Sequence, residues 1–330
     1  MSRIAAAFGS GAAVAGGGAG GGEVRATVDA VPASAGDGVL DVPLPAPPAR
    51  SKAFIAFVTG GDPSLEYSER YIRALVEGGA DLIEIGVPFS DPIAEGPVIQ
   101  EANLRALAAG TTLDGIFGLV RSLRQGHGAQ VQQGHGAQNA RGQGHGAQQG
   151  REAQAPLQVP IVLLTYLNPV HHYGYRRFFA ACAEAGVDGI IVPDLPYEEK
   201  GELSGEAAAN GIDVISLIAP TSAERVAAIA ADATGYLYLV SSLGVTGVRS
   251  EIDPSSGIAA MVGLVREATD VPVAVGFGVH TPEQAHDIAQ VADADGVIVG
   301  SAIVRMIAAD PEGAPAALTA YARSMKEALP

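Results

Sequence analysis

Apolar residues along this chain fall into eight short runs that are rich in Val, Ile and Leu. Apolarity is nearly continuous within each run, which is typical of parallel strands that are buried on both faces of a sheet. Turn residues separate one run from the next, so each run predicts one strand. The predicted strands are Ala53–Val58, Leu82–Gly86, Val159–Tyr166, Gly189–Val192, Asp213–Ile218, Tyr236–Val240, Pro272–Gly276 and Gly296–Gly300.

Segments with helical spacing lie between these runs, for example Glu66–Glu77 and Ala223–Ala231. Residues that cap helix N-termini precede several of them, and glycines that end helices follow. Eight strands alternating with helices predict an α/β fold, a single (β/α)8 TIM barrel. The predicted caps are Ser64, Thr221, Ser255 and Thr281, with Pro282 at the first helical position, and the predicted stops are Gly78, Gly79 and Gly186.

Two low-complexity segments differ from the rest of the chain. Residues 9–50 are rich in Gly, Ala and Pro, and residues 125–155 contain the sequence QGHGAQ three times. Neither segment holds enough large apolar side chains to offset the entropy of ordering its backbone, so we expect two disordered insertions. Each precedes a predicted strand, which places both insertions on the N-terminal face of the barrel, opposite the face that carries active sites.

The rest of the chain is about 250 residues, the usual size of one such barrel. We expect the barrel over residues 51–330, interrupted by residues 125–155. The histidines of the repeats, His127, His135 and His145, could bind a metal ion, but the flanking Gly and Gln residues supply no rigid frame. We therefore expect no metal site.

Composition and charge exclude several classes of function. The chain of 330 residues has 20 Lys and Arg against 36 Asp and Glu, and its net charge of −16 argues against binding of nucleic acid. No apolar stretch reaches the ~20 residues of a membrane span. The Gly-rich region that follows Met1 lacks the apolar segment of a signal peptide. The single cysteine, Cys182, excludes a disulfide within the chain and favours a cytoplasmic location.

Carboxylates gather around the second predicted strand, in the stretch DLIEIGVPFSDPIAEGPVIQ from Asp81 to Gln100. Glu84 lies inside an apolar strand, where a charge costs several kcal/mol unless it is paired or used. Asp91 and Glu95 follow in a loop rich in Pro and Gly. Such an arrangement is typical of acid–base chemistry. The alternatives are a hydrogen-bonded structural carboxylate at Glu84 and a turn-forming role for Asp91.

The loops after the last three strands favour a phosphate site. Glycines there let the backbone approach an anion closely, and a helix that begins near Ser301 presents free N–H groups and a positive dipole end. Barrels of this type often bind phosphate at these loops. The alternative is that the glycines serve only tight turns. The candidate residues are Thr246, Gly247, Gly278, Gly300 and Ser301.

The run LIEIGVPFSDP, from Leu82 to Pro92, resembles the signature of the tryptophan synthase alpha chain family. The ordered strand ends resemble the same family outside the two insertions, and residues 1–8 resemble the short helix that covers the barrel bottom there. The resemblance implies a lyase that cleaves indole-3-glycerol phosphate to indole and glyceraldehyde 3-phosphate. It implies Glu84 as the general acid at indole C3, and Glu95, where the family has an aspartate, as the acceptor of the ring N–H.

The resemblance also implies further residues and a partner. Phe57, Tyr166 and Tyr238 are expected to shape the indole pocket. A beta chain, which carries pyridoxal phosphate, is expected to join in an alpha2-beta2 heterotetramer and use the indole for tryptophan biosynthesis. The interface would include Pro88, Asp91 and Asn168. No cofactor is expected in this chain.

Three other functions fit parts of the pattern. One is a stand-alone indole-glycerol phosphate lyase on the same scaffold. Another is a catalytically weak subunit that activates a beta chain, which the glutamate at Glu95 motivates because its side chain is one methylene longer. The third is another phosphate-binding barrel of histidine or tryptophan synthesis, which would share the phosphate loops but not the LIEIGVPFSDP run.

Overall fold

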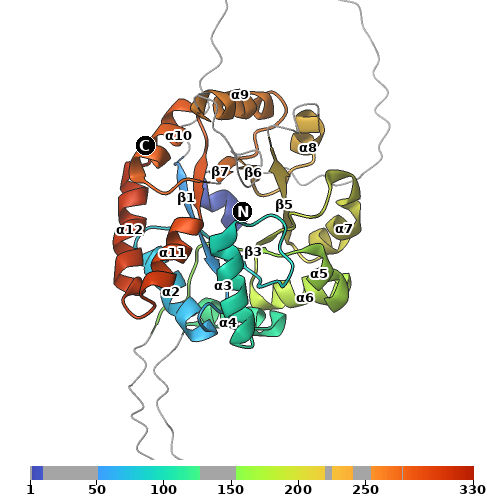
Figure 1. Ribbon diagram of the computed structural model, residues 1–330. Coiled ribbons are helices and arrows are strands. Elements are labelled where there is room, and N and C mark those ends of the chain that lie inside the picture. Colours follow the sequence, from blue (N-terminus) through green and yellow to red (C-terminus); the bar gives the residue numbers. More distant parts are fainter. Residues whose placement is uncertain (1, 10–50, 127–153, 220–224, 241–253, 277) are drawn as a thin grey trace, which may run out of the picture.

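The computed structural model describes residues 2–9, 51–126, 154–219, 225–240, 254–276 and 278–330. Eight parallel strands close into a barrel in the order β1 to β8, and helices surround it (Figure 1). The predicted TIM barrel is therefore confirmed. The strands are β1 (Ala53–Thr59), β2 (Leu82–Gly86), β3 (Ile161–Leu164), β4 (Gly189–Ile191), β5 (Asp213–Ile218), β6 (Leu237–Val240), β7 (Val273–Gly276) and β8 (Gly296–Val299).

The helices follow the strands along the chain and cover the outside of the barrel (Figure 1). Outward-facing strand residues such as Phe54, Ile83 and Leu163 are buried beneath them. The helices are α1 (Arg3–Ala7), α2 (Leu65–Glu77), α3 (Pro97–Ala108), α4 (Leu113–Gln125), α5 (Leu167–Tyr173), α6 (Tyr175–Ala185), the 3-10 turn η1 (Tyr197–Glu199), α7 (Gly201–Ala209), α8 (Val226–Ala231), α9 (Pro254–Arg266), α10 (Pro282–Val291), α11 (Ser301–Ala309) and α12 (Ala314–Ala328). No helix in the described part of the chain is long and apolar enough to cross a membrane.

Helix caps test the sequence prediction residue by residue. Ser64 and Thr281 are N-caps, and Thr281 forms a capping box with Gln284. The prediction for Ser255 is wrong, because α9 already begins at Pro254, whose fixed φ suits the first helical position. The predicted cap Thr221 lies outside the described residues. The predicted stops Gly78 and Gly186 end α2 and α6.

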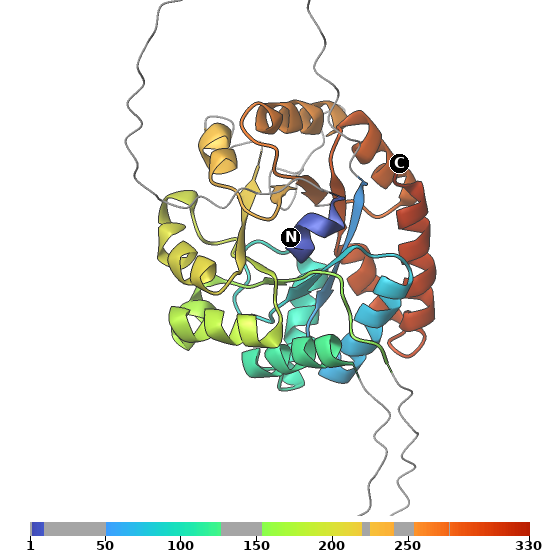
Figure 2. The ribbon, with the colours of Figure 1, turned by 180° about the vertical axis from the view of Figure 1, so that it is seen from behind.

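The inside of the barrel is closed at its N-terminal end by α1 (Figure 2). Ile4 and Phe8 are fully buried among inward-facing strand residues, and the Phe8 ring lies 5.6 Å from the ring of Tyr236. Strands β4 and β8 each begin with a glycine, next to the place where the Ile4 and Phe8 side chains enter the barrel. A Cβ atom at Gly189 would lie 3.2 Å from Ile4 Cδ1, and one at Gly296 would lie 3.1 Å from Phe8 Cε1.

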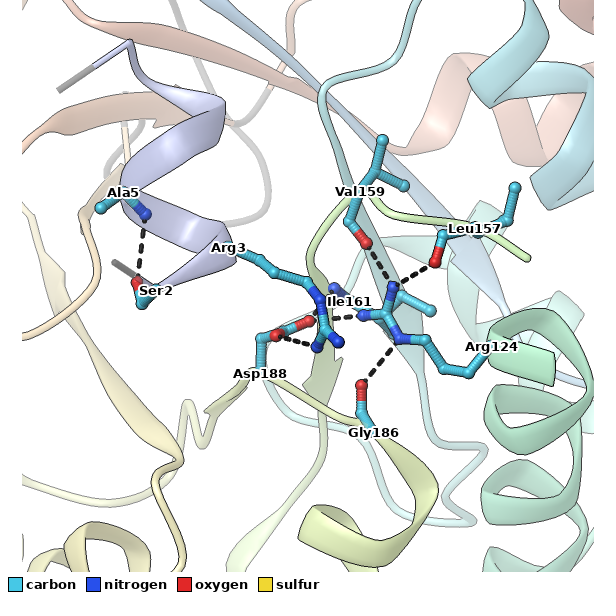
Figure 3. Close-up of polar contacts among 9 residues, drawn as sticks. All are labelled: Ser2, Arg3, Ala5, Arg124, Leu157, Val159, Ile161, Gly186 and Asp188. Carbon is cyan, nitrogen blue, oxygen red and sulfur yellow. Dashed lines mark hydrogen bonds and ion pairs between the residues drawn. The ribbon is translucent and has the colours of Figure 1, made fainter. Parts of the chain in front are cut away.

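Three aspartates link neighbouring strands at the same end of the barrel. Asp188, before β4, donates its N–H to the Ile161 carbonyl of β3 and accepts the Ile161 N–H on Oδ2, both at 2.8 Å. Its carboxylate also binds Arg124 and Arg3 (Figure 3). Asp81 makes the same pair of bonds to Phe54 of β1, and Asp295 makes it to Val273 of β7. The Asp81 carboxylate pairs with Lys326, and the Asp295 carboxylate pairs with Arg266.

The described residues that flank the two predicted insertions meet at this N-terminal end. A Cβ atom at Gly9 would lie 2.8 Å from Ser51 Oγ, and one at Gly126 would lie 2.3 Å from the Gln154 carbonyl oxygen. Most of the two segments, residues 10–50 and 127–153, lies outside the described residues. The chain therefore leaves and rejoins the barrel at almost the same point in both places.

Candidate active site

Glu84 points into the barrel from the middle of β2 and is fully buried. The Tyr236 hydroxyl donates a hydrogen bond of 2.6 Å to Glu84 Oε1. Glu84 Oε2 has no hydrogen-bond partner among the described residues. Burial raises the pKa of Glu84 to about 7, although the bond from Tyr236 acts in the opposite direction. A carboxyl group with this pKa is half protonated near neutral pH and can both give and take a proton.

Glycines open space above Glu84 at the C-terminal end of the barrel. A Cβ atom at Gly86 would lie 2.6 Å from Phe57 Cζ, and one at Gly276 would lie 2.4 Å from the Tyr238 hydroxyl. The rings of Phe57 and Tyr238 therefore lie where side chains at these positions would stand. Phe57 is also paired with Glu84 across β1 and β2. The two rings thus lie next to Glu84, as the sequence predicted for Phe57 and Tyr238.

These two rings line a cavity of about 360 Å³ at the C-terminal end of the barrel. Its apolar wall includes Leu164, Leu217 and Ile298, which project inward from their strands. Polar groups lie on two sides. The loop from Ile93 to Gly96, which carries Glu95, forms one, and the loops after β7 and β8 form the other. The cavity can hold a flat apolar group between two polar ends.

Glu95 lies at the wall of this cavity and is 8% exposed. The Tyr166 hydroxyl donates a hydrogen bond to Glu95 Oε2, and it accepts the N–H groups of Ile93 at 3.0 Å and Ala94 at 2.9 Å. Burial raises the pKa of Glu95, and the bond from Tyr166 partly opposes this. The Tyr166 hydroxyl therefore binds both the backbone of the loop and the carboxylate of Glu95, which the loop carries.

Tyr166 has a different place from the one expected. It is 2% exposed, stacks on Phe89 with ring centroids 5.0 Å apart, and does not line the cavity. The Tyr166 ring does not face the cavity, and the Tyr166 hydroxyl positions Glu95 instead. Conversely, Tyr236 was not singled out from the sequence, yet it is the tyrosine that binds Glu84. The two-residue alternation along β6 could have indicated this, because Tyr236 and Tyr238 face the same side.

The loops after β7 and β8 contain the predicted phosphate residues that the structure describes. Gly278, Gly300 and Ser301 all line the cavity. Gly278 has a φ of +92°, a conformation that favours glycine. Helix α11 begins at Ser301 without a side-chain cap, so its first N–H groups are free of side-chain acceptors. Thr246 and Gly247 lie outside the described residues.

Two residues near the predicted phosphate site line the cavity with side chains that carry nitrogen groups and were not predicted as site residues, His280 and Arg305. The His280 Nδ1–H donates to the Gly278 carbonyl at 2.7 Å, and the His280 backbone carbonyl accepts the Tyr321 hydroxyl at 2.9 Å. Arg305 lies one turn into α11. The sequence did contain a signal for Arg305. It lies four residues after Ser301, so both side chains lie on the same face of the helix.

Of the residues predicted for a partner interface, Pro88 and Asp91 lie on the loop after β2 and Asn168 lies in the first turn of α5, at the same end of the barrel. Asp91 and Asn168 are exposed, and Pro88 is half-buried. Ile93, which belongs to the same loop as Asp91, is 74% exposed. Within the described residues there is no group of three or more His, Cys, Asp or Glu side chains that could hold a metal ion.

Comparison with known proteins agrees with this geometry. The model of the family "Tryptophan synthase alpha chain" matches residues 47–130 and 146–330. The chain is 42% identical to the tryptophan synthase alpha chain of Lacticaseibacillus casei over 278 residues, which are 84% of this chain and 92% of that one. It is 46% identical to that of Geobacter sp. strain M21 over 255 residues, 77% and 83% of the two chains.

The chain belongs to the tryptophan synthase alpha chain family.

Solved structures of the family share the fold. The alpha subunit from Legionella pneumophila superposes with a TM-score of 0.68 at 35% identity, covering 84% of this chain and 92% of that one. A tryptophan synthase chain from Mycobacterium tuberculosis gives a TM-score of 0.67 at 34% identity, with coverage of 84% and 93%. Family membership was thus indicated by the LIEIGVPFSDP run.

Proposed function

We propose that this alpha chain is the lyase that cleaves indole-3-glycerol phosphate to indole and glyceraldehyde 3-phosphate, with Glu84 and Glu95 as its catalytic carboxylates. The observation that carries the proposal is Glu84. A fully buried carboxyl group with a pKa of about 7 lies beside the rings that floor a cavity of suitable shape. Family membership supplies the substrate.

The chemistry requires an aromatic carbon to become a leaving group. Glu84 would give its proton to indole C3, which places positive charge on the ring nitrogen. Glu95 would accept the ring N–H and stabilise that charge. Glu84, now ionised, would take the proton from the hydroxyl on the side-chain carbon attached to the ring. The carbon–carbon bond then breaks, its electron pair returns to the ring, and the side chain leaves as an aldehyde.

The cavity fits the parts of this substrate. The indole would lie between Phe57 and Tyr238, and the phosphate would bind at Gly278, Gly300 and Ser301. Thr246 and Gly247 would complete the phosphate site from the loop after β6. These steps use carboxylates of this chain, so the proposed mechanism needs no cofactor here. Pyridoxal phosphate would belong to the beta chain.

We also propose that a beta chain binds over the mouth of the barrel, at the loop that carries Pro88 and Asp91 and at the start of α5, which carries Asn168. The large apolar side chain of Ile93, 74% exposed on the same rim, supports an interface there. Indole is small and apolar, so direct transfer needs the partner at this mouth. The single buried cysteine, Cys182, fits an assembly in the reducing cytoplasm.

Indole release from indole-3-glycerol phosphate, measured with and without a beta chain, tests the proposal. Release by the isolated chain that increases when a beta chain is added would support both the activity and the partnership. Release that no beta chain alters would favour a stand-alone lyase. No release under either condition would contradict the proposed lyase.

One observation favours a weakly active subunit as the second candidate. Tyr166 already occupies the Glu95 carboxylate, which must instead reach the ring N–H of the substrate. A chain in which this bond persists would activate its partner without efficient cleavage of its own. Slow turnover by the isolated chain, together with normal activation of a beta chain, would support this second function.

A further inference from the structure

We propose that Arg305 binds the phosphate group of the substrate and makes the site selective for a doubly charged ligand. The inference rests on the proposed function, because it concerns the same cavity. It adds a full positive charge to a site otherwise made of backbone N–H groups and the Ser301 hydroxyl. The position, the orientation and the charge surroundings of Arg305 carry the argument.

Arg305 lies on the phosphate side of the cavity. It is the residue four positions after Ser301 on α11, and both residues line the cavity. Residues four apart lie on one face of a helix, and long side chains lean toward the helix N-terminus. The guanidinium group of Arg305 is therefore directed toward the helix end where the predicted phosphate site lies.

A hydrogen bond fixes the stem of this side chain. Arg305 Nε donates to the Ser301 carbonyl oxygen at 3.2 Å. This bond leaves the two terminal nitrogen atoms available, and neither forms an ion pair or hydrogen bond with another described residue. A guanidinium group with its two terminal nitrogens free can form a bidentate contact with phosphate oxygens.

The charge distribution around the cavity supports an anion at this end. Among the described residues that line the cavity, Arg305 is the only Lys or Arg, and Glu95 is the only acidic residue. They belong to different elements, the loop before α3 and the first turns of α11. The chain as a whole carries a net charge of −16, so an arginine without an acidic partner here is not explained by a general excess of cations.

The proposed contact has a consequence for selectivity. Backbone N–H groups bind any oxygen-rich group through partial charges, whereas a guanidinium adds a charge-assisted bond that grows with the charge of the ligand. Arg305 should therefore matter for glycerol 3-phosphate and for indole-3-glycerol phosphate. It should not matter for indole, which carries no charge and would lie at the other end of the cavity.

The test compares Arg305→Ala and Arg305→Lys with Arg323→Ala in the full chain. Arg323 is an exposed arginine on α12 that does not line the cavity, so it controls for loss of one positive charge. The dissociation constants of glycerol 3-phosphate and of indole are measured for each variant. The kcat and the KM for indole-3-glycerol phosphate are measured alongside them.

We expect Arg305→Ala to weaken glycerol 3-phosphate binding and raise KM by roughly 10-fold or more, the usual effect of losing a charge-assisted hydrogen bond. Indole binding and kcat should change less than about twofold, because the contact is the same in the ground state and the transition state. Arg305→Lys should fall in between, since a lysine keeps the charge but not the bidentate geometry.

Equal glycerol 3-phosphate binding by Arg305→Ala and Arg323→Ala would overturn the inference. A loss of kcat with unchanged KM would overturn it as well. Either result is distinct from failure of the proposed function, in which the wild-type chain itself would neither bind glycerol 3-phosphate nor release indole.

Discussion

The aspartates that precede strands at the N-terminal end of this barrel and Glu84 inside it differ in how their buried charge is handled. At the N-terminal end, Asp188 accepts hydrogen bonds from two arginines and a strand N–H, and Asp81 and Asp295 follow the same pattern. At the C-terminal end, Glu84 is more deeply buried, has one hydrogen bond from an uncharged tyrosine, and keeps one oxygen without a partner among the described residues. No cation accompanies it in its described surroundings.

The difference separates stability from chemistry. A carboxylate that is paired and hydrogen-bonded stays ionised and holds strands in register. A carboxyl group that is only desolvated has a raised pKa, and the protein tolerates this cost where proton transfer is needed. Barrels of this class generally place function at the C-terminal end and stability at the N-terminal end, and Glu84 and the three aspartates follow this division.

The largest expected effect is on catalysis, from Glu84→Gln. The amide keeps the shape of the side chain and can bond Tyr236, but it cannot deliver a proton. We expect indole release to fall by roughly 10²- to 10⁴-fold. Glycerol 3-phosphate binding should be unchanged, and it serves as the control for a folded site. Activity within about threefold of the wild type would remove Glu84 from the acid role.

The reverse effect is expected at the other end, from Asp188→Asn. This change leaves Arg124, whose side chain is 10% exposed, without its charge partner. We expect the free energy of unfolding to fall by about 3 kcal/mol, with kcat within about twofold of the wild type. Denaturant unfolding measures the first quantity and indole release the second.

Asp293→Asn is the matched control for that experiment. Asp293 also pairs with a cation, Lys52, but its side chain is 81% exposed, so its loss should cost less than about 1 kcal/mol. If Asp188→Asn and Asp293→Asn destabilise equally, the paired aspartates do not stabilise the N-terminal end as described.

A smaller effect on catalysis is expected from Tyr166→Phe. The change removes the donor to Glu95 and the acceptor of two backbone N–H groups. The pKa of Glu95 should rise further, because a hydrogen bond to the ionised form is lost. The acid limb of the pH–kcat profile should therefore move to higher pH, and kcat should fall by roughly 10-fold.

Tyr175→Phe provides the comparison for Tyr166→Phe. Tyr175 donates to Glu202 at 2.9 Å on the outside of the barrel, away from the cavity. The Tyr175→Phe variant should have the same pH–kcat profile as the wild type. A profile that Tyr166→Phe also leaves in place would show that Tyr166 does not act through Glu95.

The smallest effect is expected from deleting residues 127–153 and joining Gly126 to Gln154. These two residues are already in contact at the N-terminal end of the barrel, so the deletion requires little rearrangement. Shortening a loop also lowers the entropy of closing it only slightly. We expect unchanged kcat and a free energy of unfolding within about 1 kcal/mol of the wild type. A folded deletion variant with a large loss of indole release would contradict this separation of the two ends.

The sequence predicted the barrel well and drew attention to Glu84, because both depend on local pattern. Each strand is a continuous apolar run, and Glu84 interrupts one of them. The LIEIGVPFSDP run adds family information that no single residue carries. Strand ends were correct to within a few residues. The third strand was predicted too long, since β3 begins at Ile161 after Pro160, which has no N–H for the sheet.

Contacts between distant parts of the chain could not be predicted in the same way. Whether Tyr166 or Tyr236 lies beside Glu84 depends on the stagger of strands around the closed barrel, which the sequence of one strand does not contain. The links from Asp188 to Arg124 and Arg3 join residues 64 and 185 positions apart. Arg305 was missed because the sequence analysis followed the glycines of the loops and did not examine the residue four positions after Ser301 on the same helix face.

The titration of Glu84 tests the central claim most directly. Its folded pKa of about 7 exceeds the ordinary value of 4.5, so the pH-dependent part of the cost of burying the carboxyl is small below pH 4.5 and grows progressively up to pH 7. The free energies of unfolding of the wild type and Glu84→Gln should be measured from pH 4.5 to pH 8. We predict that Glu84→Gln gains stability relative to the wild type as pH rises, by about 3 kcal/mol at pH 8. A difference that stays constant across this range would contradict the account, because Glu84 would then be paired or solvated like the aspartates at the other end.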